Sequence, residues 1–324
     1  MRAFVSFILR GRWHAMLSAI VAAVLSLLLP LLGHISGAIV SLVTLRNGAA
    51  EGIIVACGAL LVLAGLGLVS TLQHEVVTTF LVAMGAVVWL PAVIIAAVHR
   101  QRRDYGAALA IAAGIGLSGI LMMYIIIDDV TGWWTRLLEA VLMPLLADLR
   151  TTMPEAELKK LLENMAEVMT GLVAAMIVYS IMINLMIARW WQSLLFNPGG
   201  FRAEFLRLRL GRVATIVALI IIAFSMLGGK AMSSLAGNLV VLVVAVFSLQ
   251  GLALLHAMID HYKAHVGWLV GAYVLMLLLA PQAMVTLAAL GLTDSWLDFR
   301  ARWGSMPPPG DGRGQGDGPT DQMN

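Results

Sequence analysis

Charged residues and cysteine are both scarce in this chain of 324 residues. Asp, Glu, Lys and Arg make up 12% of it, 60% is hydrophobic, and the mean hydropathy is +0.92. A soluble domain carries about twice this share of charged residues to cover its surface. The single cysteine, Cys57, excludes a disulfide within one chain and a cysteine-based metal site. The composition therefore predicts an integral membrane protein.

Apolar stretches recur along the chain, and most are long enough to cross a bilayer core of roughly 30 Å. In hydrocarbon every backbone amide needs a partner within the protein, so such spans must be helices. The sequence predicts an all-α, polytopic membrane helix bundle with about eight to nine transmembrane helices. The stretches are residues 15–32, 34–45, 50–71, 76–98, 106–127, 167–188, 213–228, 236–257 and 267–292.

The arginines predict an orientation. They cluster before the first span, in residues 99–104 and in residues 188–212. Residues 128–164 instead hold seven acidic against four basic residues, a net charge of −3. Because basic loops stay in the cytoplasm, we expect a cytoplasmic N-terminus and an N-terminal six-helix bundle over residues 1–190, with residues 128–164 outside.

The acidic outer connection has its own helical pattern. Trp133, Trp134, Leu137 and Leu138 recur at helical spacing, which is typical of an amphipathic helix with tryptophans at headgroup depth. A capping-box pair, Thr152 and Glu155, then begins a helix that continues into the sixth span. We expect an amphipathic outer helical hairpin packed on the bundle, with a gating lid as the alternative.

Residues 191–212 form a basic and aromatic elbow that follows the six-helix bundle. Asn197-Pro198-Gly199-Gly200 predicts a turn. We interpret the elbow as a cytoplasmic segment on the lipid surface, with a docking surface for a protein partner as the alternative. The net charge of +3 is too small for nucleic-acid binding. Its expected lipid or partner contacts are Trp190, Trp191, Phe201, Arg202, Phe205, Arg207 and Arg209.

The rest of the chain is predicted to hold C-terminal membrane helices over residues 213–303 and a disordered tail over residues 304–324. The tail is rich in Pro and Gly and nearly free of apolar residues. Nine crossings would leave this tail outside, whereas a re-entrant break at Pro281 would return it to the cytoplasm. The sequence leaves open on which side of the membrane the tail lies.

Few residues point to chemistry. The sequence holds no P-loop, zincin histidine pair or nucleophile elbow, and "GIGLSG" at 114–119 lies inside a span, where it favours close helix packing over dinucleotide binding. His256, Asp260, His261 and His265 are more typical of a solvated helix end than of a metal site. We therefore expect no metal, no cofactor and no enzymatic activity.

Polar residues inside the spans are candidates for a ligand site. Burying a polar group in a membrane is unfavourable, so such residues mark either binding sites or hydrogen bonds between helices. Both interpretations stay open. The candidates are Tyr124, Tyr179, Asn184 and Gln250.

Four C-terminal segments resemble the YybS-like family of bacterial membrane proteins of undetermined activity. They are "ARWWQSLLFNPGGFRAEFLRLRLGR" (188–212), "LQGLALLHAMI" (249–259), "GWLVGAYVLMLLL" (267–279) and "LGLTDSWLDFRAR" (290–302). The segment "LLPLLGHISGAIVSLVTLRNGAAEGIIVACGAL" is similar to the opening of that family. More loosely, it is similar to the S components of energy-coupling-factor vitamin transporters. The resemblance implies a protein of the bacterial inner membrane.

The second resemblance implies a substrate-binding subunit whose first helix packs against a membrane coupling protein through small residues. Ala15, Ala19 and Ala23 would form that contact, unless they pack within their own bundle. The favoured function is a non-catalytic small-molecule-binding or transport-associated subunit without its own ATPase. A membrane scaffold or regulator that docks partners through the elbow is the alternative, and a lipid-acting enzyme using Asp128-Asp129 comes third. The oligomeric state stays open.

Overall fold

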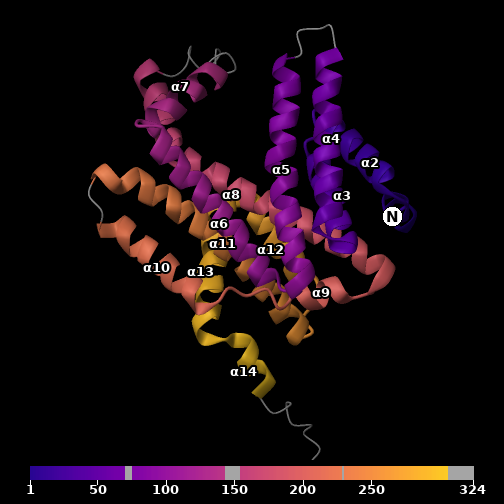
Figure 1. Ribbon diagram of the computed structural model, residues 1–324. Coiled ribbons are helices and arrows are strands. Elements are labelled where there is room, and N and C mark those ends of the chain that lie inside the picture. The colour runs from indigo at the N-terminus through magenta and orange to yellow at the C-terminus, as the bar shows by residue number, and fades with distance from the viewer. Residues whose placement is uncertain (70–74, 143–153, 228–229, 306–324) are drawn as a thin grey trace, which may run out of the picture.

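The computed structural model describes residues 1–69, 75–142, 154–227 and 230–305, and every regular element in these ranges is a helix (Figure 1). This confirms the all-α fold. The helices are α1 (Arg2–Ile8), α2 (Arg12–Leu25), α3 (Leu31–Asn47), α4 (Ala49–Val69), α5 (Glu75–Arg102), α6 (Tyr105–Ile126), α7 (Val130–Leu142), α8 (Glu155–Phe196), α9 (Gly200–Phe205), α10 (Arg212–Leu227), α11 (Lys230–His261), α12 (Gly267–Leu278), α13 (Ala280–Leu297) and α14 (Phe299–Ser305).

Three helices of the described residues are long and apolar enough to cross a membrane: Tyr105–Ile126, Ala156–Phe196 and Ser233–His261. A fourth results if α1 and α2, which meet at an angle of 116°, form one bent span. Shorter apolar helices cover Ala49–Gly65, Arg212–Leu227 and Gly267–Leu278. The structure thus supports a membrane protein with several apolar helices, but by length and composition it has three to four spans rather than eight to nine.

Two predicted spans are divided by proline. The run 15–32 is helical only to Leu25, because Pro30 restricts the residue before it and begins the next helix, α3. The run 267–292 breaks at Leu279, with Pro281 in the first turn of α13. A proline has no N–H to donate to the preceding turn, so the apolar run does not form one helix.

Helix α8 is the central element of the fold. It packs against α3, α5, α6 and α11, and one buried cluster extends from Val5 to Ala288. Its 42 residues correspond to about 63 Å, twice the thickness of a bilayer core. The predicted projection of the sixth span beyond the membrane therefore agrees with the length of α8.

The first half of the outer connection is the amphipathic helix α7, which packs on α8 (Figure 1). Trp134 Nε1 donates a hydrogen bond to Thr170 Oγ1 at 2.8 Å, and Leu138 is buried with Leu162 and Ala166. This supports packing rather than a free lid for residues 130–142. Thr152, the first residue of the expected capping box, lies outside the described residues.

Helices α11 and α13 pack closely against each other through glycine residues. A Cβ at Gly251 would clash with the carbonyl oxygen of Leu287, and one at Gly291 would clash with that of Phe247. Small residues on both helices therefore let the two backbones touch. This contact positions the basic end of the molecule, which we define as the end carrying α9 and α14 (Figure 1).

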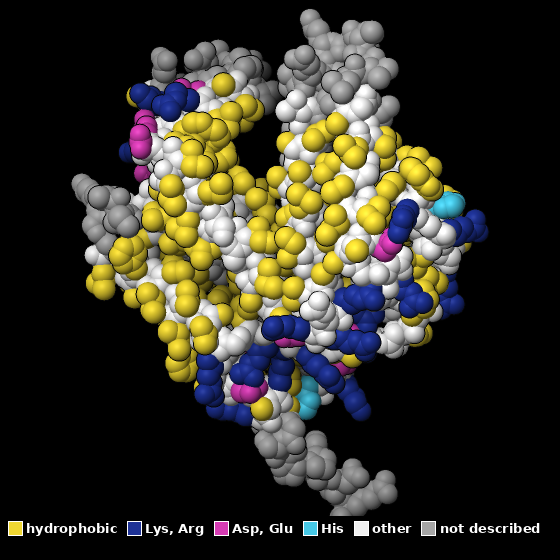
Figure 2. Space-filling model, viewed as in Figure 1, with side chains coloured by type: hydrophobic (Ala, Val, Ile, Leu, Met, Phe, Trp, Pro, Cys, Tyr) yellow, Lys and Arg dark blue, Asp and Glu magenta, His cyan; other side chains and the backbone are white. Residues whose placement is uncertain are grey.

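The surface is divided by residue type (Figure 2). Hydrophobic side chains cover the middle of the molecule, and Lys and Arg side chains gather at the basic end. At the opposite end, a hollow separates the arm formed by α4 and α5 from the arm that carries α7 (Figures 1 and 2).

Candidate functional site

The elbow joins α8 to α10 at the basic end. Helix α8 ends at Phe196, and Gly199 follows with a φ of +84°, a left-handed conformation that glycine adopts readily. The six-residue helix α9 comes next, and α10 begins at Arg212. The turn predicted at residues 197–200 is confirmed.

An ion pair fixes α9 to the ends of two long helices. Glu204 accepts hydrogen bonds from Arg189 Nε at 2.8 Å and Nη2 at 2.6 Å, and from His99 Nε2 at 3.1 Å. Burial alone would raise the pKa of Glu204, but the hydrogen bonds from His99 and Arg189 and the charge of Arg189 outweigh it and lower the pKa to about 2. Glu204 is therefore a carboxylate at every physiological pH.

A groove of about 500 Å³ opens beside α9, between α8, α11 and α12. This volume lies within the range of about 300–1,000 Å³ typical of small-molecule sites. Its walls are mostly apolar and its polar lining is limited to a few side chains. The apolar walls include Met186, Phe201, Phe205, Leu252, Ile259 and Leu269, and the polar lining consists of Arg202, His256, Asp260, Lys263 and Tyr273.

Aromatic rings line one side of this groove. Phe201 and Phe205 stack with centroids 5.9 Å apart, Phe205 meets His256 edge-on at 5.4 Å, and His256 lies 6.0 Å from Tyr273. The Tyr273 hydroxyl is 3.3 Å from His256 Nε2, while His256 Nδ1 bonds the carbonyl oxygen of Leu252 at 2.8 Å. The rings come from three helices, α9, α11 and α12, and form one aromatic side of the groove.

The rim of the groove carries exchangeable charge. Arg202 Nη2 lies 2.5 Å from Asp260 Oδ1, and these side chains are 70% and 43% exposed. Exposed ion pairs contribute little to stability, so Arg202 can leave Asp260 for another anion at little cost. Lys263, two residues past the end of α11, adds a second cation to the rim.

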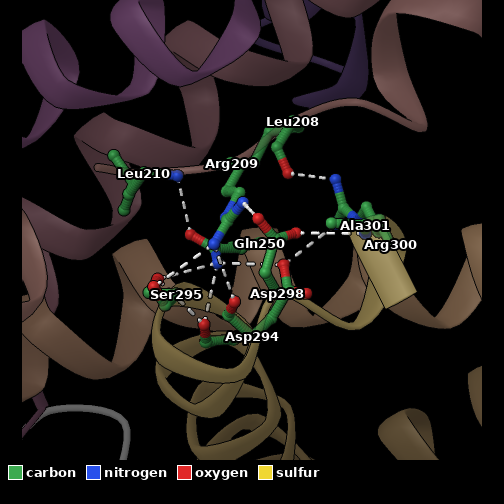
Figure 3. A network of polar contacts seen from close by, with 10 residues as sticks. Leu208, Arg209, Leu210, Gln250, Asp294, Ser295, Asp298, Arg300 and Ala301 are labelled. Carbon is green, nitrogen blue, oxygen red and sulfur yellow. Dashed lines mark hydrogen bonds and ion pairs between the residues drawn. The ribbon is translucent and has the colours of Figure 1, made fainter. Parts of the chain in front are cut away.

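A polar network anchors the chain that follows α9 (Figure 3). Gln250 Oε1 accepts a hydrogen bond from the backbone N–H of Leu210 at 2.8 Å, and Gln250 Nε2 donates to the carbonyl oxygen of Gly291 at 2.8 Å and to Ser295 Oγ at 3.0 Å. Arg209 pairs with Asp298 at 2.5 Å and thereby lowers the pKa of that carboxyl. Gln250 and Arg209 thus hold α11, α13 and the elbow together.

The four residues predicted as ligand contacts do not form one site, and among the described residues no two of them share a hydrogen-bond partner. Tyr124 bonds Ser234 at 2.7 Å and Tyr179 bonds Ser248 at 2.8 Å. Asn184 bonds His34 at 3.1 Å, and Gln250 belongs to the elbow network. Each bond joins separate segments of the chain, which favours the alternative interpretation of hydrogen bonds between helices.

Several predicted lipid or partner contacts face inward instead. Trp191 is 1% exposed whereas its neighbour Trp190 is 40% exposed, because one step along a helix turns a side chain by a quarter of a turn or more. Ala15 and Ala19 are fully buried, and Ala23 packs partly buried against the same core. The Ala19 carbonyl accepts a hydrogen bond from Ser36 Oγ at 2.8 Å. The packing of this small-residue stripe within its own bundle favours the alternative interpretation.

The elbow residues divide into three environments. Phe201, Arg202 and Phe205 line the groove. Arg209 is bound to Asp298, and Arg207 is exposed. Arg207 and Trp190 keep the surface position expected for a general lipid contact, and Arg202 is exposed as well but lies at the rim of the groove.

Sequence reasoning found part of the groove. It singled out His256 and Asp260, which both line the groove, whereas Lys263 was not among its candidates and Tyr273 lies in an apolar run that gave no signal. In the described part of the chain no group of three His, Cys, Asp or Glu residues could hold a metal ion. Here Asp260 pairs with Arg202 instead.

Comparison with protein families gives one match over most of the chain: residues 15–295 match the family of predicted membrane proteins DUF2232. The chain belongs to the DUF2232 family. Neither the curated proteins nor the solved structures include a match to this family member.

Proposed function

We propose that this DUF2232 family member is a non-catalytic membrane protein that binds a small amphipathic anion in the groove beside α9. The observation that carries the proposal is the groove itself, with about 500 Å³ of mostly apolar space and two cations at its rim. An apolar chain or ring system would pack against Phe201, Phe205 and Leu269. An acidic head would replace Asp260 as the partner of Arg202 and bind Lys263.

The orientation follows from charge. Lys and Arg side chains gather at the basic end (Figure 2), which supports a cytoplasmic location for the groove and the N-terminus in a bacterial inner membrane. In this arrangement the shorter apolar helices and the arm of α4 and α5 would supply the remaining crossings of an eight- to nine-span protein. The YybS-like and S-component resemblances are consistent with a transport-associated subunit.

Transport would require a partner, because the sequence holds no ATPase motif. The buried position of Ala15 and Ala19 gives no support to a coupling protein at that stripe. A scaffold role is the second candidate, and it rests on the exposed Trp190 and Arg207 at the same end of the molecule.

The test is a binding measurement with dansyl-undecanoic acid, a fluorescent fatty acid with an apolar chain and a carboxylate. Protein in phosphatidylcholine nanodiscs should bind it saturably. Ala264→Trp places an indole in the groove that Ala264 lines and should weaken binding about tenfold or more. Leu277→Trp, on a side chain that is 83% exposed, is the control and should bind like the wild type. Equal affinity in all three proteins would refute the proposal.

A further inference from the structure

A second cavity lies at the basic end and shares no lining residue with the groove. It has a volume of about 210 Å³ and lies where α3, α5 and α8 end. Arg46 comes from the last turn of α3, Arg100 and Arg103 from the end of α5, and Arg189 from α8. Gln192 and Phe196 of α8 also line the cavity.

The positive charge of this cavity is not neutralised within the described chain. Arg46, Arg100 and Arg103 are exposed, and none of them pairs with an acidic residue in the described ranges. Arg189 pairs with Glu204 through Nε and Nη2. Three guanidinium groups around one small cavity repel one another unless an anion lies between them.

Two of the guanidinium groups are already held in place. The Arg46 guanidinium carbon lies 4.0 Å from the centroid of the Phe196 ring, in cation-π geometry. Arg100 Nη1 donates to the carbonyl oxygens of Thr44 and Leu45, both at 3.4 Å. Each group keeps further N–H donors for a ligand, and little side-chain freedom remains to be lost when a ligand binds.

Arg103 occupies a backbone position that usually belongs to glycine. Its φ is +50°, and its N–H bonds the carbonyl oxygen of His99 at 2.7 Å just past the end of α5. A left-handed residue after a helix is most often glycine, because a Cβ makes this conformation unfavourable. Strain of this kind tends to persist where the side chain has a function. Here the strained residue places a third guanidinium in the cavity wall.

The buried edge of the cavity also has an unpaired polar atom. His99 lines the cavity and is 1% exposed, and its Nε2 bonds Glu204. Its Nδ1 is buried and has no hydrogen-bond partner among the described residues. Because Nε2–H is donated to Glu204, Nδ1 of the neutral imidazole is an acceptor, and a hydroxyl group of a bound ligand would satisfy it.

We propose that this cavity binds a phosphate monoester dianion through Arg46, Arg100 and Arg103. Arginine matches phosphate oxygens with two parallel N–H donors, and three arginines can surround one tetrahedral group. The volume suits a head group rather than a whole lipid. The same chemistry is offered by the head group of phosphatidic acid and by a small soluble phosphate ester, so the test separates the two sources.

The experiment uses the full chain in phosphatidylcholine nanodiscs. One arm titrates glycerol 3-phosphate by calorimetry, and the other measures thermal unfolding in discs with and without phosphatidic acid. We expect saturable binding or a higher midpoint in at least one arm. Glycerol 3-phosphate binding identifies a soluble ligand, and an effect of phosphatidic acid alone identifies the lipid head group. The proposal is overturned if neither ligand has an effect.

Arg→Lys variants, which keep the positive charge, distinguish a specific phosphate site from non-specific electrostatic attraction. The triple variant Arg46→Lys, Arg100→Lys, Arg103→Lys keeps the charge but loses the paired donors, and it should weaken binding about tenfold. The control is Arg2→Lys, Arg207→Lys, Arg212→Lys, three exposed arginines outside the cavity, and it should bind like the wild type. No loss in either triple variant would mean attraction to charge alone, and equal loss in both would mean that the loss is not specific to the cavity; either result would overturn the site.

Arg103→Gly tests whether lost binding reflects the missing side chain rather than misfolding. Glycine relieves the backbone at φ +50°, so the ligand-free protein should unfold at the same or a higher temperature while binding the phosphate several-fold more weakly. Unchanged affinity would contradict the role of Arg103. The groove variant Ala264→Trp should bind the phosphate normally, so failure of either proposal can be distinguished from failure of the other.

Discussion

Arg189 of α8 and Glu204 of α9 form a two-pronged ion pair, with Nε and Nη2 lying 2.8 and 2.6 Å from the two carboxylate oxygens. The pair lies between the phosphate cavity and the groove, because Arg189 lines the cavity and α9 carries three groove residues. Its loss should therefore affect the stability of the elbow and both proposed sites.

Glu204→Gln should destabilise the protein. The substitution leaves Arg189 without a counterion, and because the Arg189 side chain is largely buried while Glu204 is partly exposed, we expect a cost of about 1–3 kcal/mol. Thermal unfolding in mild detergent measures the effect. Glu51→Gln is the control, because it breaks the exposed pair with Arg12 and should change the midpoint little. Equal shifts for the two variants would contradict the structural role of the Arg189–Glu204 pair.

Glu204 should also make the stability depend on acid pH. Its folded pKa of about 2 lies below the ordinary value of 4.5, so the carboxylate stabilises the fold fully above about pH 4.5. This contribution is lost as the pH falls from there through about 2, because the unfolded chain takes up the proton first. Unfolding midpoints of the wild type and Glu204→Gln, measured from pH 6 downward, should converge. A constant difference across that window would be inconsistent with the lowered pKa.

Gly251→Ala and Gly291→Ala should each destabilise the contact between α11 and α13. Each new methyl group meets a backbone carbonyl oxygen of the facing helix, and overpacking of this kind costs about 1–3 kcal/mol or more. Gly271→Ala in α12 is the matched control, because a Cβ there meets nothing within 4 Å. It should stabilise α12 by up to about 1 kcal/mol. Thermal unfolding of the three variants tests the contact, and destabilisation by all three would point to a general intolerance of alanine.

Cysteine labelling tests the orientation. In a Cys57→Ala background, single cysteines at Gln101 and Ala203 should be protected from an impermeant thiol reagent in intact cells, whereas a cysteine at Ala156 should react. All three positions are exposed, so burial does not explain a difference. Reaction of Gln101→Cys and Ala203→Cys before cell lysis would reverse the proposed topology.

Much of the fold follows from local signals. Apolar runs locate the long helices, and the Pro-Gly turn at residues 197–200 locates the elbow. The amphipathic pattern at Trp133 and Trp134 predicts α7. Each of these features is set by residues close together in the sequence, which is why the sequence alone predicts it.

The site depends on contacts between distant parts of the chain. In a membrane both the lipid-facing side and the buried side of a helix are apolar, so Trp190 and Trp191 look alike in sequence although only one is buried. In the sequence Arg209 matches the pattern of a lipid contact, but the end of α13 brings Asp298 to it. The cavity forms because Arg46 and Arg103, at the ends of two helices, meet beside α8. No local pattern predicts these pairings.

The most direct test of the proposed function is to identify what the groove holds in the cell. Wild-type protein, Ala264→Trp and Leu277→Trp would be purified in mild detergent, and their bound small molecules identified by mass spectrometry. Our account predicts an amphipathic acid that copurifies with the wild type and with Leu277→Trp but is depleted from Ala264→Trp. The same set of bound molecules on all three proteins would contradict it.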